Sequence, residues 1–163
     1  MRGSLARFID IQGWASSTLK SSVEFNQFCV DVLTEELSFY SSFPFKEEVK
    51  ANNLPAIIFY TEVMEGDNAS TADFFRTWTL PFVVQIIPNE KSEDVGGVTS
   101  WTSTLDIKKI IYKACEILEA NACNIEGGDV RFLKIESLTT TDIDEADDLQ
   151  AQVFVMFGED NGL

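Results

Sequence analysis

The side chains of this chain that could do chemistry are mostly carboxylates, and they are densest in the segment 139–149. This segment holds five acids and no base, with all five acids inside 142–148. Carboxylate oxygens bind Ca²⁺, but the EF-hand register fails, because Asp147 stands where glycine is needed and Val153 where a bidentate Glu is needed. The sequence favours a solvated hairpin loop here, with a weak, irregular cation site as the alternative.

The residue types that are missing exclude most kinds of catalytic site. The 163 residues include no histidine, which excludes a Ser-His-Asp or Cys-His nucleophile and histidine-bound zinc. The sequence also lacks a phosphate-binding GxxxxGK(S/T) loop, and Cys29, Cys115 and Cys123 lack CxxC spacing. The acids fall in predicted loops and on the outer faces of predicted helices. We therefore predict no catalytic residue, no metal site and no cofactor, and a protein that is not an enzyme.

The charge of the chain argues against nucleic-acid binding. Twelve basic and 27 acidic residues give a net charge of 12 − 27 = −15, and only Lys108 and Lys109 are adjacent basic residues. A duplex-binding surface needs clustered Lys and Arg to neutralise phosphates. The apolar stretch 8–11 is too short for a signal sequence, and no segment approaches the roughly 20 apolar residues that span a bilayer. The sequence predicts a soluble protein with no specific nucleic-acid or membrane partner.

Two N-terminal segments precede the first predicted strand. Residues 1–20 are interpreted as an arm, whose large apolar side chains must pack on the same domain or on a neighbouring subunit. Ser21 and Glu24 fit a capping box, and an apolar stripe of helical periodicity then predicts a helix of about 18 residues. The side chains interpreted as an assembly arm are those of Phe8, Ile9, Ile11 and Trp14.

A long β-hairpin is predicted in the middle of the chain. Residues 54–63 are β-branched and aromatic, as in a strand covered on both faces, and residues 74–87 alternate in polarity. Pro81 cannot donate a hydrogen bond to a sheet, so an edge position, a bulge or a break is expected there. Because the strands are long, the tip of the hairpin should project from the domain. The segments 64–73 and 88–101 are predicted loops.

The remaining elements complete an α+β fold. An Ile/Leu stripe predicts a helix over 103–121, and alternating apolar residues predict strands at about 129–138 and 150–157. The predicted order is α-β-β-α-β-β. We expect an antiparallel or mixed β-sheet of four or more strands with two amphipathic helices packed on one face. Residues 21–163 are predicted to form a single domain.

This order of elements resembles the tail terminator proteins of tailed bacteriophages, which are also called tail completion or minor tail proteins. The similarity covers roughly residues 21–158 and rests on element order, size and acidity. It consists of the N-terminal helix, the Leu-Pro-Ala-Ile-Ile strand at 54–58, the long strand 74–87, the helix 103–121 and two final strands. The family has no motif from which binding residues could be carried over, and the N-terminal arm has no counterpart in the family pattern.

The resemblance implies a virion structural protein that is made in the cytoplasm of the bacterial host. Six copies would form a ring that caps the tail tube and joins it to the head, with tail tube or sheath protein and neck or connector proteins as partners. DNA that passes through such a ring would meet acidic loops that repel its phosphates. The acids expected at the lumen or at an interface are Glu65, Asp67, Asp73, Asp142, Asp144, Glu145, Asp147 and Asp148.

Other functions fit the same sequence. An acidic inhibitor or DNA mimic that occupies a basic groove on a partner would also carry a charge of this size, with its acids on one face of a monomer or dimer. Another neck, adaptor or tube component would have the same sequence features as a terminator. An enzyme that uses only carboxylates or a metal is a third alternative.

Overall fold

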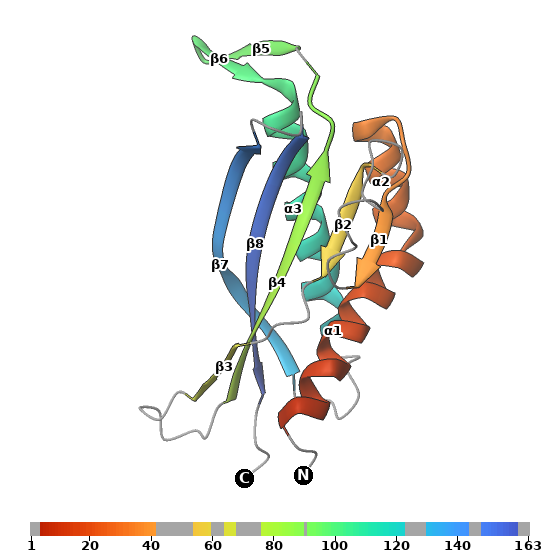
Figure 1. Cartoon of the computed structure of the whole chain (residues 1–163), viewed down its shortest axis with the longest axis vertical. Helices are drawn as coiled ribbons and strands as arrows, with labels where there is room; N and C mark the ends of the chain where they lie inside the picture. Colours follow the sequence, from red (N-terminus) through yellow and green to blue (C-terminus); the bar gives the residue numbers. More distant parts are fainter. Residues whose placement is uncertain are drawn as a thin grey trace.

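Helices and strands make up most of the chain that the computed structural model describes, which is residues 4–41, 54–59, 64–67, 76–89, 91–122, 130–143 and 148–159. These residues form three α-helices and eight β-strands (Figure 1). Their order along the chain is α1 (Ser4–Ser21), α2 (Val23–Leu33), β1 (Ser38–Ser41), β2 (Ala56–Phe59), β3 (Met64–Asp67), β4 (Arg76–Ile86), β5 (Ser92–Val95), β6 (Val98–Trp101), α3 (Thr102–Asn121), β7 (Val130–Ile143) and β8 (Asp148–Glu159).

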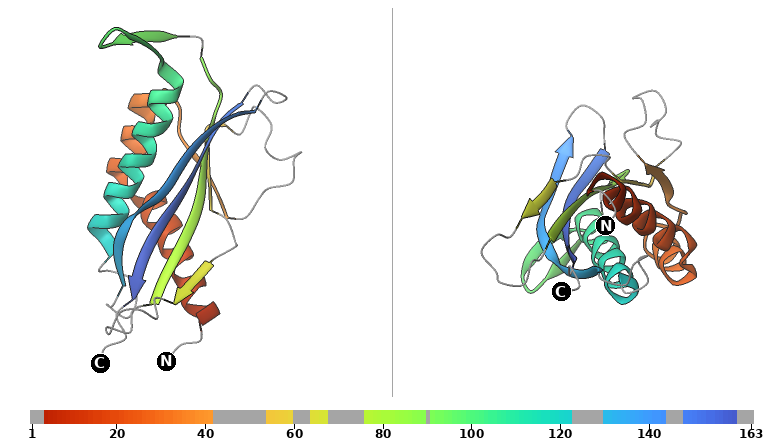
Figure 2. Two further views of the ribbon diagram at one scale, coloured as in Figure 1. Left: turned by 90° about the vertical axis from the view of Figure 1, so that its left-hand side faces the viewer. Right: turned by 90° about the horizontal axis from the view of Figure 1, so that it is seen from below.

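One mixed β-sheet lies at the centre of the fold. Its strands follow the order β1-β2-β4-β8-β7, and β3 pairs with β4 beside this path. β1 is parallel to β2, whereas the other pairs are antiparallel. The three helices lie on one face of this sheet (Figure 2). The α+β class predicted from the sequence is confirmed. The predicted order α-β-β-α-β-β is not confirmed, because a second N-terminal helix and further short strands are present.

Apolar side chains alternate along the long strands β4 and β8, so that every second residue faces the helices. Among the described residues, β4 pairs with β3 as far as Thr79 and with β2 from Phe82 onward, while β8 pairs with β4 throughout, including Pro81. Residues 60–63 lie outside the described part of the chain, so the edge position, bulge or break expected at Pro81 stays a prediction. The helix-facing side chains are Leu80, Phe82, Val84 and Ile86 of β4 and Leu149, Ala151, Val153, Val155 and Phe157 of β8.

The C-terminal strands are longer than the sequence analysis predicted. The segment 139–149 was predicted to be a loop, yet β7 and β8 remain paired as far as Ile143 and Asp148. Three consecutive threonines at 139–141 explain the difference, since β-branched residues favour strands. β7 is an edge strand with register shifts between Phe132 and Lys134 and between Ile135 and Ser137. Such bulges reduce the tendency of an edge to pair with other chains.

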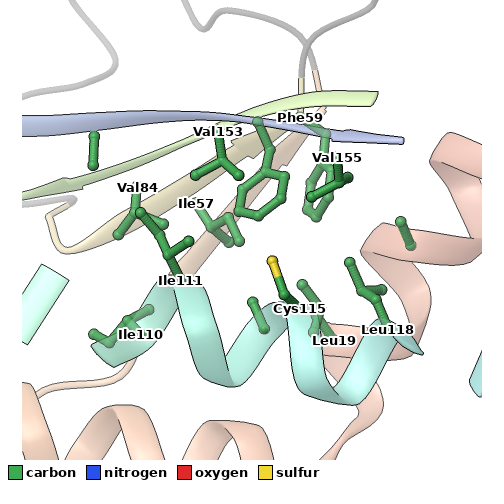
Figure 3. Packing of buried hydrophobic residues seen from close by; sticks show 14 of the residues in the cluster. Leu19, Ile57, Phe59, Val84, Ile110, Ile111, Cys115, Leu118, Val153 and Val155 are labelled. Atoms are coloured by element: carbon green, nitrogen blue, oxygen red, sulfur yellow. The ribbon is translucent and has the colours of Figure 1, made fainter. Parts of the chain in front are cut away.

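The hydrophobic core lies between α3 and the sheet (Figure 3). Ile111 of α3 points toward Val84 of the sheet, and the side chains of Ile110, Ile111, Val84 and Val153 are all fully buried. Each fully buried side chain of this size contributes on the order of 1.5–3 kcal/mol to folding. On the opposite face of the sheet, Ile58 is paired with Val83 and both are also fully buried. The centre of the sheet is therefore closed on both faces.

Helix α1 is part of this core. Ile11, Ala15 and Leu19 recur every four residues along one side of the helix, and each is fully buried. Trp14 packs edge-on against Phe157 of β8, with 5.7 Å between the ring centroids. Residues 1–20 were interpreted as an arm that packs on the same domain or on a neighbouring subunit. The structure shows a helix over Ser4–Ser21 whose described apolar residues cover the same sheet as α3, so this segment packs on its own domain.

A charged contact joins α2 to α3. The Nζ atom of Lys113 donates hydrogen bonds to the carboxylates of Glu24 and Glu116 and lies 5.9 Å from the ring centroid of Phe28. The pKa of Lys113 is raised, chiefly by its hydrogen bond with Glu24. The N-cap of α2 is Ser22, whose side chain accepts a hydrogen bond from the Phe25 N–H at 3.1 Å, one residue later than predicted. The contacts of Lys113 with Glu24 and Phe28 hold α2 against α3.

Candidate assembly surface

A two-stranded hairpin projects from the end of the fold where β4 ends and α3 begins (Figure 1). β5 and β6 are antiparallel, and Val95 and Val98 pair on either side of the turn. Gly96 and Gly97 form the turn with φ values of 63° and 81°. Positive φ at both turn residues matches the twist of the strands, and glycine adopts it without strain. The predicted loop over 88–101 is therefore corrected to a hairpin.

Hydrogen bonds hold the base of this hairpin against α3. The Thr102 N–H donates to the Lys91 carbonyl at 2.9 Å, and the Asn89 N–H donates to Ser103 Oγ at 2.7 Å. The Asn89 side-chain oxygen accepts from the Lys91 N–H at 3.1 Å. An isolated two-stranded hairpin is marginally stable in water. Here the base is fixed to the first turn of a 20-residue helix, which holds the hairpin at one position.

Large apolar side chains are exposed on both faces of the hairpin. Val95 is 54%, Val98 64% and Trp101 58% exposed, and Ile87 beside the end of β4 is 52% exposed. Val95 and Val98 share one face because they are direct partners, whereas Trp101 lies three positions after Val98 and so on the other face. Only two other large hydrophobic side chains of the described residues are as exposed. Apolar side chains that gather on a projecting element are typical of a protein interaction site.

The outer face of α3 carries a small patch of basic and aromatic side chains, which we call the α3 patch and define as Lys108, Lys109 and Tyr112. Tyr112 is 58% exposed, and Lys109 Nζ lies 3.4 Å from Asp106 Oδ1. Lys108 is half-buried and forms no ion pair with any residue that the structure describes. One helical turn separates Lys108 from Tyr112, so both side chains lie on the same side of α3.

The four described acids among those predicted to line a channel lie at opposite ends of the sheet. Glu65 and Asp67 lie in β3, which pairs with the first residues of β4. Asp142 and Asp148 lie where β7 and β8 meet, in the rungs beside the last residue of β4. The 86 − 76 = 10 residue steps along β4 correspond to about 33 Å. The structure describes only the backbone of these four acids, and Asp73, Asp144, Glu145 and Asp147 lie outside the described residues.

The four residues interpreted as an assembly arm all belong to α1. Ile11 is fully buried, and Trp14 packs on Phe157 of the same chain. These two residues are therefore corrected to core residues. The side chains of Phe8 and Ile9 lie outside the described residues.

The thiols of the core are poor nucleophiles. Burial raises the pKa of Cys29 to about 12 and that of Cys115 to about 12, and the charge of Glu119 adds to the shift at Cys115. A thiol with such a pKa contains very little thiolate at neutral pH. Cys123 lies outside the described residues.

Within the described ranges, no group of three or more Cys, Asp or Glu side chains could hold a metal ion. None of the helices formed by these residues is long and apolar enough to cross a bilayer.

Sequence reasoning missed the apolar residues of the hairpin. It treated 88–101 as a loop, although these residues include a hairpin on which Trp101 is exposed. A signal was present, because a Gly-Gly doublet between two short runs with β-branched or aromatic residues is typical of a hairpin with a two-residue turn. The exposure of Val95, Val98 and Tyr112 could not be derived from local sequence, since it depends on what packs around them.

No protein-family model matches the chain, and no curated protein matches it. The candidate assembly surface therefore rests on its own geometry. It consists of the β5–β6 hairpin, which is fixed at its base and exposes apolar side chains on both faces, and the α3 patch on the adjoining helix.

Proposed function

We propose that this protein is a structural subunit of a bacteriophage tail, a terminator that assembles into a ring at the end of the tail tube. The observation that carries the proposal is the β5–β6 hairpin, which presents Val95, Val98 and Trp101 to solvent. Such an element stabilises an assembly when it buries these side chains against a neighbouring subunit. The resemblance to tail terminators rests on α2, β2, β4, α3, β7 and β8, which follow one another along the chain in the expected sequence with further elements between them, and this subset supports the same role.

Strand pairing between subunits is a second proposed route to assembly. The long hairpin predicted from the sequence, formed by β2 and β3 with β4, would project at the end of the subunit opposite to the β5–β6 hairpin. β1 and β7 are the edge strands of the sheet, and edge strands can pair with another chain. A closed ring uses such edges without open-ended polymerisation.

The charge of the chain suits a channel for DNA. Six chains would carry 6 × (−15) = −90, and an acidic lumen would repel DNA phosphates so that the genome slides without sticking. The acids at 65–67 and 142–148 would lie near the two ends of such a channel. Charge reversal across 142–148 should slow DNA passage and reduce infectivity. Unchanged infectivity would exclude this loop from the lumen.

Under this proposal the protein is a non-enzymatic component of the virion tail or neck. Its partners would be the tail tube or sheath protein and the neck or connector proteins, with no cofactor and no membrane contact. A different neck, adaptor or tube component would use the same surfaces and is included in the proposal at this level.

The solution mass of the purified protein tests self-assembly. Light scattering should give a species of about six chains, 6 × 18.3 = 109.8 kDa, or a shift toward it as salt increases from low to moderate concentration. Salt screens the mutual repulsion of chains that each carry −15. A monomer at every protein and salt concentration would contradict self-assembly and favour the acidic inhibitor, for which a basic partner would then be sought.

A further inference from the structure

We propose that the tip of the β5–β6 hairpin of one chain docks on the α3 patch of a second copy. This contact would be the repeating contact of the ring, so the inference rests on the proposed self-assembly. The hairpin face involved, which we call the tip face, consists of Glu93, Val95 and Val98.

The tip face combines an apolar end with an acid behind it. Val95 and Val98 are direct partners, and Glu93 lies two residues before Val95, so the three side chains project from the same side of the hairpin. Val95 and Val98 are more than half exposed, and Glu93 is also exposed. The side chain of Asp94 on the other face accepts a hydrogen bond from the Gly97 N–H at 2.7 Å, which stabilises the turn. The tip face is therefore presented by a pre-organised hairpin.

The α3 patch has the complementary chemistry. Its two lysines are the only adjacent basic residues in a chain with 27 acids. Tyr112 offers an exposed aromatic ring one turn from Lys108. Lys113 is already held by Glu24 and Glu116 in the same chain, and Lys109 lies beside Asp106. Among the residues that the structure describes, Lys108 is therefore the lysine of α3 that has no ion-pair partner in its own chain, and we expect it to pair with a second chain.

The spacing of the side chains on the tip face matches the spacing of the side chains on the α3 patch. Residues two apart in a strand are separated by about 6.6 Å, and residues four apart on a helix face by about 5–6 Å. When Val95 and Val98 lie on the ring of Tyr112, Glu93 is placed near Lys108. Contact between copies thus pairs apolar with aromatic side chains and an acid with a base.

The contact joins two different surfaces of the subunit. Val95, Val98 and Tyr112 are all exposed in the single chain, so the hairpin does not cover the patch of its own helix. A contact between unlike surfaces leaves one free hairpin and one free α3 patch at the two ends of a growing oligomer. Such a head-to-tail contact generates a closed ring when the rotation between neighbours closes.

A charge swap tests the proposed pair directly. The variants are Glu93→Lys, Lys108→Glu and the combination of both, with Glu36→Lys and Lys20→Glu as charge-reversal controls at exposed positions away from both surfaces. Light scattering over a series of protein concentrations at constant salt gives the concentration at half-assembly, which is the protein concentration at which half of the chains are assembled. Each single reversal should raise this concentration by about three- to tenfold, the effect expected from the loss and reversal of one exposed ion pair. The combined variant should assemble at a concentration close to that of the wild type. The two control variants should assemble like the wild type.

An apolar substitution tests the other half of the contact. Val98→Thr keeps a β-branched side chain but exposes a hydroxyl, and it should also raise the concentration at half-assembly. Val23→Thr is the matched control, since Val23 is 83% exposed and lies on α2. Thermal unfolding of each variant checks that the fold is intact.

The possible results separate the two proposals. If the wild type assembles and neither single reversal changes its assembly, the hairpin does not dock on α3 and instead serves a different partner, while the proposed ring stands. If the single reversals weaken assembly and the combination does not restore it, Glu93 and Lys108 do not pair and the inference is wrong. A wild type that stays monomeric would overturn the inference and the proposed self-assembly together.

Discussion

At the scale of single residues, Gly13 occupies a helical position that does not need glycine. It is exposed in the interior of α1, and a Cβ atom added there would meet nothing within 4 Å. Glycine costs about 0.5–1 kcal/mol relative to alanine inside a helix, because more backbone entropy is lost on folding. We expect Gly13→Ala to raise the free energy of unfolding by about this amount, measured by urea denaturation. A loss of stability would show that the helix is not continuous at this position.

The two buried cysteines make a second prediction at this scale. Burial raises the pKa of Cys29 and Cys115 from 9.0 to about 12, so the folded protein keeps both thiols protonated at pH 8. In a Cys123→Ser variant, a thiol reagent should therefore react slowly with the native protein and rapidly after denaturation. Fast labelling of the native protein at pH 8 would contradict the buried positions of both residues.

The same shifts determine how pH acts on stability. For an acid whose pKa is higher in the folded state, the protonated thiol is favoured by folding, and this stabilisation is fully present below pH 9. It is lost as pH rises from about 9 to about 12. The buried cysteines therefore favour unfolding in strongly alkaline solution.

At the scale of elements, the contribution of α1 to stability distinguishes an N-terminal arm from a part of the core. Ile11 is fully buried, and truncation of such a side chain to alanine costs about 2–5 kcal/mol. We expect Ile11→Ala to lower the free energy of unfolding by this amount, with Gly13→Ala as the control on the same helix. A change of less than about 0.5 kcal/mol would restore the interpretation of residues 1–20 as an arm.

A second prediction at this scale concerns the turn of the β5–β6 hairpin. Gly96 has a φ of 63°, which asparagine tolerates and a β-branched residue does not. We expect Gly96→Asn to leave the solution mass unchanged and Gly96→Val to weaken assembly, because valine strains the turn that presents the tip face. Global thermal stability should change little in both variants, since the hairpin lies outside the core. Equal behaviour of the two variants would exclude the hairpin from the assembly contact.

At the scale of the whole molecule, the absence of histidine fixes the response to pH. No side chain of the chain has an ordinary pKa between pH 5 and 8. The pKa shifts of Cys29, Cys115 and Lys113 are all upward, away from this range. We expect solution mass and stability to be constant from pH 6 to 8 and to change below about pH 5, as carboxylates gain protons. A transition near pH 6.5 would reveal a strongly perturbed acid.

Salt acts on the whole charge of the chain and on the proposed contact in opposite directions. Screening weakens the Glu93–Lys108 pair, but one exposed ion pair contributes only about 0.2–1 kcal/mol. The repulsion between chains that each carry −15 is shared by many charges and is screened over about 8–10 Å at moderate salt. Assembly should therefore increase with salt overall.

The amino-acid sequence by itself determined the elements whose signals are local. The stripe of α3, the alternation of β4 and β8 and the apolar stripe of α2 predicted these four elements, because a helix or a strand that covers a core repeats its apolar residues with its own period. The α+β class followed from the same pattern. Four-residue strands such as β1 were missed, since they are too short to display a period.

Only the tertiary structure decided which of these elements meet. Strand pairing joins residues far apart in the sequence, so the parallel pair of β1 with β2 and the separation of the two acidic segments by about 33 Å could not be derived from periodicity. The same holds for Ile11 and Trp101. Both are large apolar residues, yet Ile11 is buried under the sheet and Trp101 is exposed on a hairpin. Their difference arises from the neighbours that the fold places around each side chain.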